Sequence, residues 1–134
     1  MVELCLELSA GKSVDAIFVY GSIEDTALSF NACYLYEQSI ISASKISESS
    51  SMTKDFLRLG SQDLSEVVAV CKQYGKSIPT EIRLVYDVNK GTLDTRYQYN
   101  SICGVGTGIT PMQVFEQWKK DIVLRYNEED SGRG

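Results

Sequence analysis

The chain has 134 residues, of which 43% are hydrophobic and 23% charged, and it carries a formal net charge of −5 without a single histidine. This size and composition predict one globular domain over residues 1–134 that buries about two-thirds of its unfolded surface. Because histidine is absent, catalysis by a histidine base and the commonest zinc ligand are both excluded.

The charge and the cysteine content of the chain indicate which kind of binding partner and which cell compartment to expect. The balance of 18 acidic against 13 basic residues disfavours direct nucleic-acid binding and suits the capture of a basic protein. No stretch is long and apolar enough to span a membrane, and the first residues lack the features of a signal peptide. The four cysteines form no CxxC pair, which favours reduced, buried thiols over disulfides. We therefore expect a cytoplasmic protein.

The first third of the chain predicts a helix and a hairpin. Residues 1–10 alternate as in a strand, but they are rich in helix formers and precede Gly11, so a short helix is favoured. Residues 14–23 are nearly all apolar or β-prone, as in a central strand. After a turn at residues 24–25, the alternation of residues 26–36 predicts the partner strand of a hairpin.

The middle of the chain changes from strand to helix periodicity. Residues 39–46 predict a third strand near an edge of the sheet, and the serine-rich segment 47–51 predicts a loop. Apolar residues at i, i+3, i+4 and i+7 from Leu64 predict an amphipathic helix. Asp63 is the expected N-cap of this helix, and Gly75 marks its end.

Residues 79–99 give the strongest pattern in the chain, an antiparallel hairpin. Apolar residues alternate with polar ones on both sides of a turn at residues 89–91, where Gly91 can adopt the positive φ that the turn requires. The apolar residues share one face only in one register. That register pairs Asp87 with Thr92, Tyr86 with Leu93, and Ile82 with Tyr97.

The C-terminal part predicts a capped helix. The glycine-rich stretch 100–109 lacks the GK[ST] of a P-loop, so a flexible connection is favoured over a phosphate cradle. Thr110 as N-cap, Pro111 at the first helical position and Gln113 form a capping box. An apolar stripe follows at Phe115, Trp118, Ile122 and Tyr126. The polar tail, residues 127–134, is expected to be disordered.

Together these elements predict an α+β fold: an antiparallel sheet of about four to five strands, built on two hairpins and packed with two or three helices. Most of the larger aromatic residues are expected in the core, namely Tyr34, Tyr36, Tyr86, Tyr97, Phe115 and Trp118.

Catalytic chemistry finds little support in this chain. The carboxylates of the hairpin alternate with Arg83 and Arg96, which is more typical of a solvated or partner-binding face than of a shielded acid–base or metal site. Cys71 and Cys103 have no histidine to activate them, and core packing is favoured for both. We therefore predict a binding protein without metal or cofactor, not an enzyme.

The C-terminal half resembles a known family. The segment EIRLVYDVNKGTLDTRYQY, followed by a loop and a helix carrying TPMQVFEQWKKDI, is similar to the YezG-like immunity proteins of bacterial polymorphic toxins and contact-dependent growth inhibition systems. The similarity covers residues 79–122, and residues 14–36 fit the family's hairpin by position. The resemblance implies a small cytoplasmic antitoxin that binds and neutralises a cognate toxin, typically a nuclease domain.

The residues predicted to bind such a toxin follow from the sheet-face pattern and not from the resemblance. They are the hairpin row Glu81, Asp87, Asp94 and Arg96, with Glu24 and Asp25 of the first turn as second choice. We expect a monomer or a weak homodimer, since a free edge strand can pair with a second copy. The alternatives are a non-catalytic adaptor or scaffold domain for another protein, and a small enzyme that uses carboxylates alone.

Overall fold

The computed structural model describes residues 1–10, 12–24, 27–47, 49–100 and 108–133, with side chains described as far as residue 125. The elements in chain order are α1 (Val2–Leu8), β1 (Ala16–Glu24), β2 (Ala27–Tyr36), β3 (Ser39–Ser42), α2 (Ala43–Ile46), α3 (Ser50–Gln73), β4 (Glu81–Asp87), β5 (Thr92–Gln98) and α4 (Pro111–Arg133). The α+β prediction is confirmed: the described residues form five strands, as expected, and four helices, one more than expected.

The sheet is antiparallel throughout, in the order β3-β2-β1-β4-β5. The predicted register of the second hairpin is confirmed, because Asp87 pairs with Thr92, and Ile82 with Tyr97. Gly91 has a φ of 67°, and its backbone N–H donates to the carbonyl of Asp87 at 2.8 Å. Strand β1 lies at the centre and is buried along almost its whole length.

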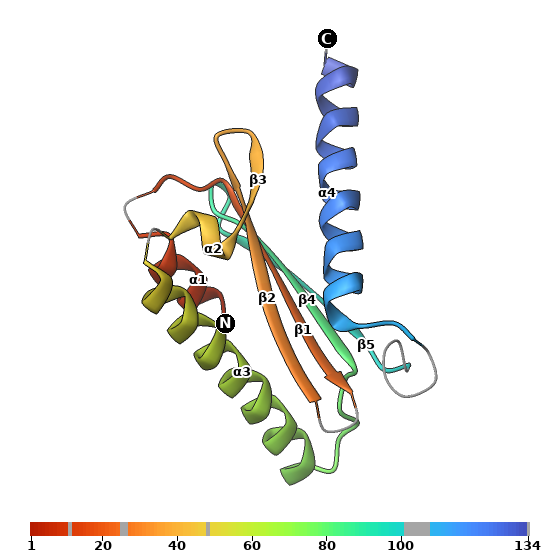
Figure 1. The fold of residues 1–134 in the computed structure, drawn as a ribbon. Helices are drawn as coiled ribbons and strands as arrows, with labels where there is room; N and C mark the ends of the chain where they lie inside the picture. The colour runs from red at the N-terminus through yellow and green to blue at the C-terminus, as the bar shows by residue number, and fades with distance from the viewer. Residues whose placement is uncertain (11, 25–26, 48, 101–107, 134) are drawn as a thin grey trace.

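Helices cover both faces of the sheet (Figure 1). Helices α1, α2 and α3 lie on one face, where α3 packs against β2 and α1 against α3. Helix α4 lies on the opposite face, where Phe115, Trp118 and Ile122 pack against Phe18 and Tyr20 of β1. Within the described residues no helix is both long and apolar enough to cross a membrane.

Helix α3 starts at Ser50, so the predicted start at Asp63 and the predicted loop over residues 47–51 are wrong in part. The side chain of Ser49 accepts a hydrogen bond from the backbone N–H of Met52 at 3.2 Å and caps the first turn. The added turns bury Phe56 and Gly60 against the sheet. Serine is a poor helix former but a good cap, and here tertiary burial extends the helix beyond its amphipathic stripe.

The predicted third strand is also shorter than expected. Strand β3 ends at Ser42, and Ala43–Ile46 forms the short helix α2. Ala43 and Ile46 are both buried, and the i, i+3 spacing of a helix places the two on one face.

Helix α4 has the predicted capping box. The backbone N–H of Thr110 donates to Gln113 Oε1 at 2.9 Å, and the backbone N–H of Gln113 donates to Thr110 Oγ1 at 3.2 Å. The helix continues to Arg133, into the segment that the sequence analysis expected to be a disordered tail.

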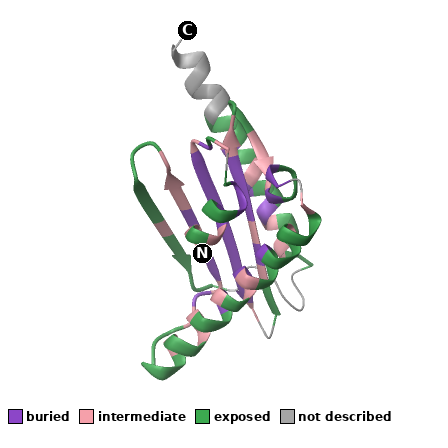
Figure 2. Ribbon diagram, turned by 90° about the vertical axis from the view of Figure 1, so that its left-hand side faces the viewer, coloured by how far each residue is buried: buried purple, intermediate pink, exposed green. Residues whose placement is uncertain are grey.

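Strand β5 departs most from the sequence-based expectation. Tyr34, Phe115 and Trp118 are buried as predicted, but Tyr97 is 53% exposed. The prediction of a core position for Tyr97 is wrong because β5 is the edge strand, beyond the part of the sheet that α3 covers. Figure 2 shows the β4–β5 hairpin at one side of the molecule, with β5 exposed along most of its length.

Candidate partner-binding surface

The β4–β5 hairpin carries four of the six predicted site residues, and the register fixes their face. The register places all four on the face of the sheet that α4 covers at β1 and β2, namely Glu81, Asp87, Asp94 and Arg96. Helix α4 packs over β1 and β2 and leaves β5 open. Exposure therefore rises from β4 to β5 on this face, and the predicted row divides into a buried and an exposed part.

Asp94 and Arg96 form the exposed part. Their side chains are 63% and 77% exposed, and Arg96 Nε lies 3.4 Å from Asp94 Oδ2. Exposed ion pairs of this kind contribute little to stability. Both side chains are therefore free to exchange this contact for one with a partner at small cost.

Glu81 is not part of an exposed row, so that expectation is wrong. Its side chain is buried, and its neighbours on the two flanking strands are Ser22 of β1 and Gln98 of β5. Glu81 Oε1 is 2.7 Å from Arg83 Nε, whose guanidinium stacks over the Trp118 ring at 5.1 Å. The geometry is that of an ion pair without a directed hydrogen bond, and Glu81 Oε2 has no hydrogen-bond partner among the described residues. Glu81 thus belongs to the packing beneath α4.

Asp87 serves the turn. Its Oδ1 accepts a hydrogen bond from the backbone N–H of Lys90 at 3.0 Å, which closes the hairpin together with the bond from Gly91. The side chain is half-buried. Asp87 is therefore a structural residue of the turn.

The two second-choice residues lie elsewhere. Glu24 ends β1 and pairs with Ala27, at the end of the sheet where β4 begins. The seven-residue strand β4 separates this end from Asp87 by about 20 Å. Asp25 lies outside the described residues. The structure thus brings Asp94 and Arg96 together and does not unite the six predicted residues in one site.

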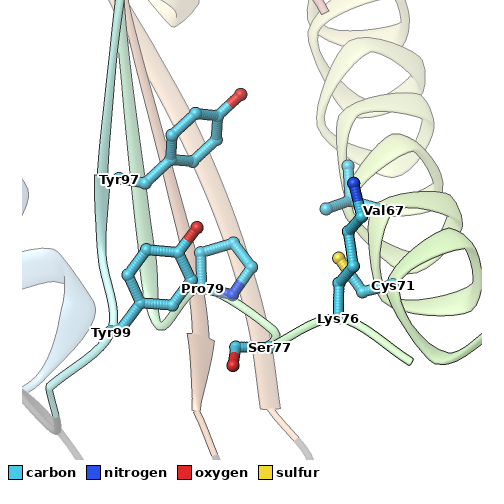
Figure 3. Close-up of a pocket in the computed structure, with 7 residues that line it drawn as sticks. All are labelled: Val67, Cys71, Lys76, Ser77, Pro79, Tyr97 and Tyr99. Carbon is cyan, nitrogen blue, oxygen red and sulfur yellow. The ribbon is translucent and has the colours of Figure 1, made fainter. Parts of the chain in front are cut away.

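The opposite face of β5 carries apolar residues, of which Tyr97 was predicted to lie in the core. Leu93, Tyr97 and Tyr99 are 54%, 53% and 57% exposed. Tyr97 and Tyr99 project toward the C-terminal end of α3 across an open pocket of about 460 Å³ (Figure 3). Its other lining residues are Val67, Cys71, Lys76, Ser77 and Pro79. Strand periodicity identified the face of these residues, but it carries no signal of whether a helix covers them.

The described cysteines are poor candidates for a catalytic nucleophile. Burial raises the pKa of the Cys5 thiol and of the Cys33 thiol to about 12, so both stay protonated at neutral pH. Cys5, Cys33 and Cys71 are free, and Cys5 and Cys33 are buried as predicted. Cys71 is half-buried at the pocket and does not lie in the core, so that prediction is wrong, and Cys103 lies outside the described residues. No group of three cysteine or carboxylate side chains within the described ranges is placed to hold a metal ion.

Comparison of the chain with models of known protein families and with curated proteins finds no match. The resemblance to YezG-like immunity proteins therefore stays a prediction, and the surface itself is the guide to function.

Proposed function

We propose that this chain acts by binding another protein, and that the partner is a toxin domain, a basic nuclease, which it neutralises stoichiometrically in a bacterial cytoplasm. The observation that carries the binding role is the uncovered strand β5. It exposes Asp94 and Arg96 on one face and Leu93 and Tyr97 on the other. Exposed large apolar side chains are typical of protein-binding surfaces.

The toxin as partner rests on the sequence resemblance and is consistent with the charge. A net charge of −5 attracts a basic nuclease over long range and raises the association rate. Carboxylates such as Asp94 and Asp87 would then occupy positions that the nuclease offers to phosphates. Glu81 is excluded from this contact by its burial.

Co-expression tests the proposal. The C-terminal domain of the protein encoded directly upstream is expressed in bacteria with and without this chain, and the complex is recovered by pull-down. We expect the domain to be toxic alone and harmless with this chain, and the two to co-purify. A harmless domain, or a toxic one that neither binds nor is neutralised, would refute the immunity role.

Charge reversal tests the residues. Asp94→Lys should weaken toxin affinity at least about tenfold, since one favourable contact becomes repulsive. Asp55→Lys is the matched control, because Asp55 is 66% exposed on α3 and its substitution changes the net charge equally. Equal affinities for the two variants would exclude Asp94 from the interface.

A second candidate is an adaptor domain with a standing partner, and the pocket between β5 and α3 favours it. That pocket is open and lined by Tyr97, Tyr99 and Val67, so it can accept an apolar side chain of a peptide. An adaptor would bind its partner without relieving any toxicity, and the same co-expression experiment separates the two functions.

A further inference from the structure

We propose that β5 is also the site of self-association: a second copy of this chain pairs with it antiparallel, about a two-fold axis at Thr95. The two sheets then join into one continuous ten-stranded sheet. This inference does not depend on the identity of the toxin.

The outer edge of β5 presents backbone N–H and C=O groups that a second strand can bond. The backbone N–H of Val88 donates to the carbonyl of Asp15 at 3.0 Å, which sets the alternation of hydrogen bonds along β4. Along β4, residues whose backbone groups bond to β1 alternate with residues whose backbone groups bond to β5. Since Val88 bonds on the β1 side, Asp87 bonds to β5, and its partner there is Thr92. The β5 residues that direct both backbone groups away from the sheet are consequently Leu93, Thr95 and Tyr97. No described residue adds a strand beyond them.

Charge selects the register. With the axis at Thr95, Asp94 of each copy lies opposite Arg96 of the other, and Leu93 lies opposite Tyr97. Shifting the axis to Asp94 places two aspartates opposite each other, and shifting it to Arg96 places two arginines there. Like charges directly opposite destabilise a strand pair, whereas opposite charges and aromatic–aliphatic pairs stabilise it. The Thr95 register therefore forms opposite-charge pairs on one face of the strand and Leu93–Tyr97 pairs on the other.

The pairing also explains the exposed apolar residues. Leu93 and Tyr97 are more than half exposed in the single chain, and the pairing brings Leu93 of each copy beside Tyr97 of the other. An isologous contact needs a self-complementary patch, and the sequence Leu-Asp-Thr-Arg-Tyr is self-complementary when reversed on itself. The opposite edge, β3, has four residues and no such pattern of charge.

Pairing at the edge leaves the faces of β5 accessible. Asp94 and Arg96 stand on the face that α4 leaves open, so a toxin can approach them in the dimer as well. Asp94 takes part in both contacts, so the variant that separates self-association from toxin binding is Thr95→Pro, which alters the edge of the strand and keeps its charges.

The test measures the mass of the full chain in solution by analytical ultracentrifugation over a range of concentrations. Asp94→Arg and Arg96→Asp each place like charges opposite one another and should weaken the dimer about tenfold or more. Mixing these two variants restores both opposite-charge contacts, so the mixture should associate as the original chain does. Asp55→Arg is the control for Asp94→Arg, with the same change in charge on α3, and it should dimerise normally.

A backbone variant tests the edge itself. Thr95→Pro removes an outward N–H and keeps the hydrogen bonds to β4, as proline is tolerated on an edge strand. It should abolish dimerisation and leave the far-ultraviolet circular dichroism unchanged. A monomeric original chain at all concentrations, or a dimer that survives Thr95→Pro or both charge variants, would overturn the proposal. A monomer whose toxin binding is lost in Thr95→Pro would assign the edge to the toxin instead.

Discussion

Replacing Gly60 with alanine sets two effects of known size against each other. Gly60 lies inside α3 where the helix meets β2, and a Cβ added there would approach the ring of Phe30 closer than 3.0 Å, a separation that real Cβ atoms avoid. Phe30 is 6% exposed and packs edge-to-face against Phe56 with ring centroids 5.2 Å apart, so its ring cannot swing into solvent.

The cost of the steric clash exceeds the gain in helix propensity. Alanine gains about 1 kcal/mol over glycine in a helix interior. Overpacking a well-filled core costs about 1–3 kcal/mol, and an overlap with a confined ring falls at the upper end. We therefore expect Gly60→Ala to lower the free energy of unfolding by about 2 kcal/mol, and the melting temperature by several degrees.

Urea denaturation followed by circular dichroism measures this difference. Ser65→Ala is the control, because Ser65 is exposed on the same helix and reports helix propensity alone. In the double variant Gly60→Ala with Phe30→Leu, the smaller side chain should recover part of the loss, which a double-mutant cycle quantifies. If Gly60→Ala is as stable as the original chain or more so, the close approach of α3 to β2 described here is wrong.

Three further predictions concern stability. Tyr34→Phe should cost about 1 kcal/mol in urea denaturation, because the hydroxyl donates a 2.7 Å hydrogen bond to the carbonyl of Cys5 inside the core. The free energy of unfolding should fall as pH rises from 9 toward 12, since the buried thiols of Cys5 and Cys33 stay protonated in the folded state up to a pKa of about 12 but ionise near 9 when unfolded. A Cys33→Ala variant with an unchanged alkaline slope in denaturant titrations would contradict that reasoning. Thr110→Ala should destabilise the chain by about 1 kcal/mol, because it removes the hydroxyl that accepts from the backbone N–H of Gln113, whereas Thr110→Ser should retain stability in the same assay.

Three local interactions were read correctly from the sequence. The β4–β5 register, the positive φ of Gly91 and the capping box of Thr110 depend on residues a few positions apart, and each leaves a pattern in the sequence. The fold class followed from the same patterns. Strand alternation and helical periodicity report which residues share a face, and consecutive strands followed by helices favour an α+β arrangement.

The candidate site depended on which strands the helices cover, and this is a property of the whole fold. Alternation placed Glu81 and Asp94 on the same polar face, yet one is buried between β1 and β5 and the other is 63% exposed at the edge. Likewise Ile82 and Tyr97 share an apolar face, and only Ile82 is buried, since α3 does not cover β5. The sequence by itself determined which residues lie side by side. Only the tertiary structure decided which of them meet solvent, because the position of a helix over a sheet is set by packing between segments far apart in the chain.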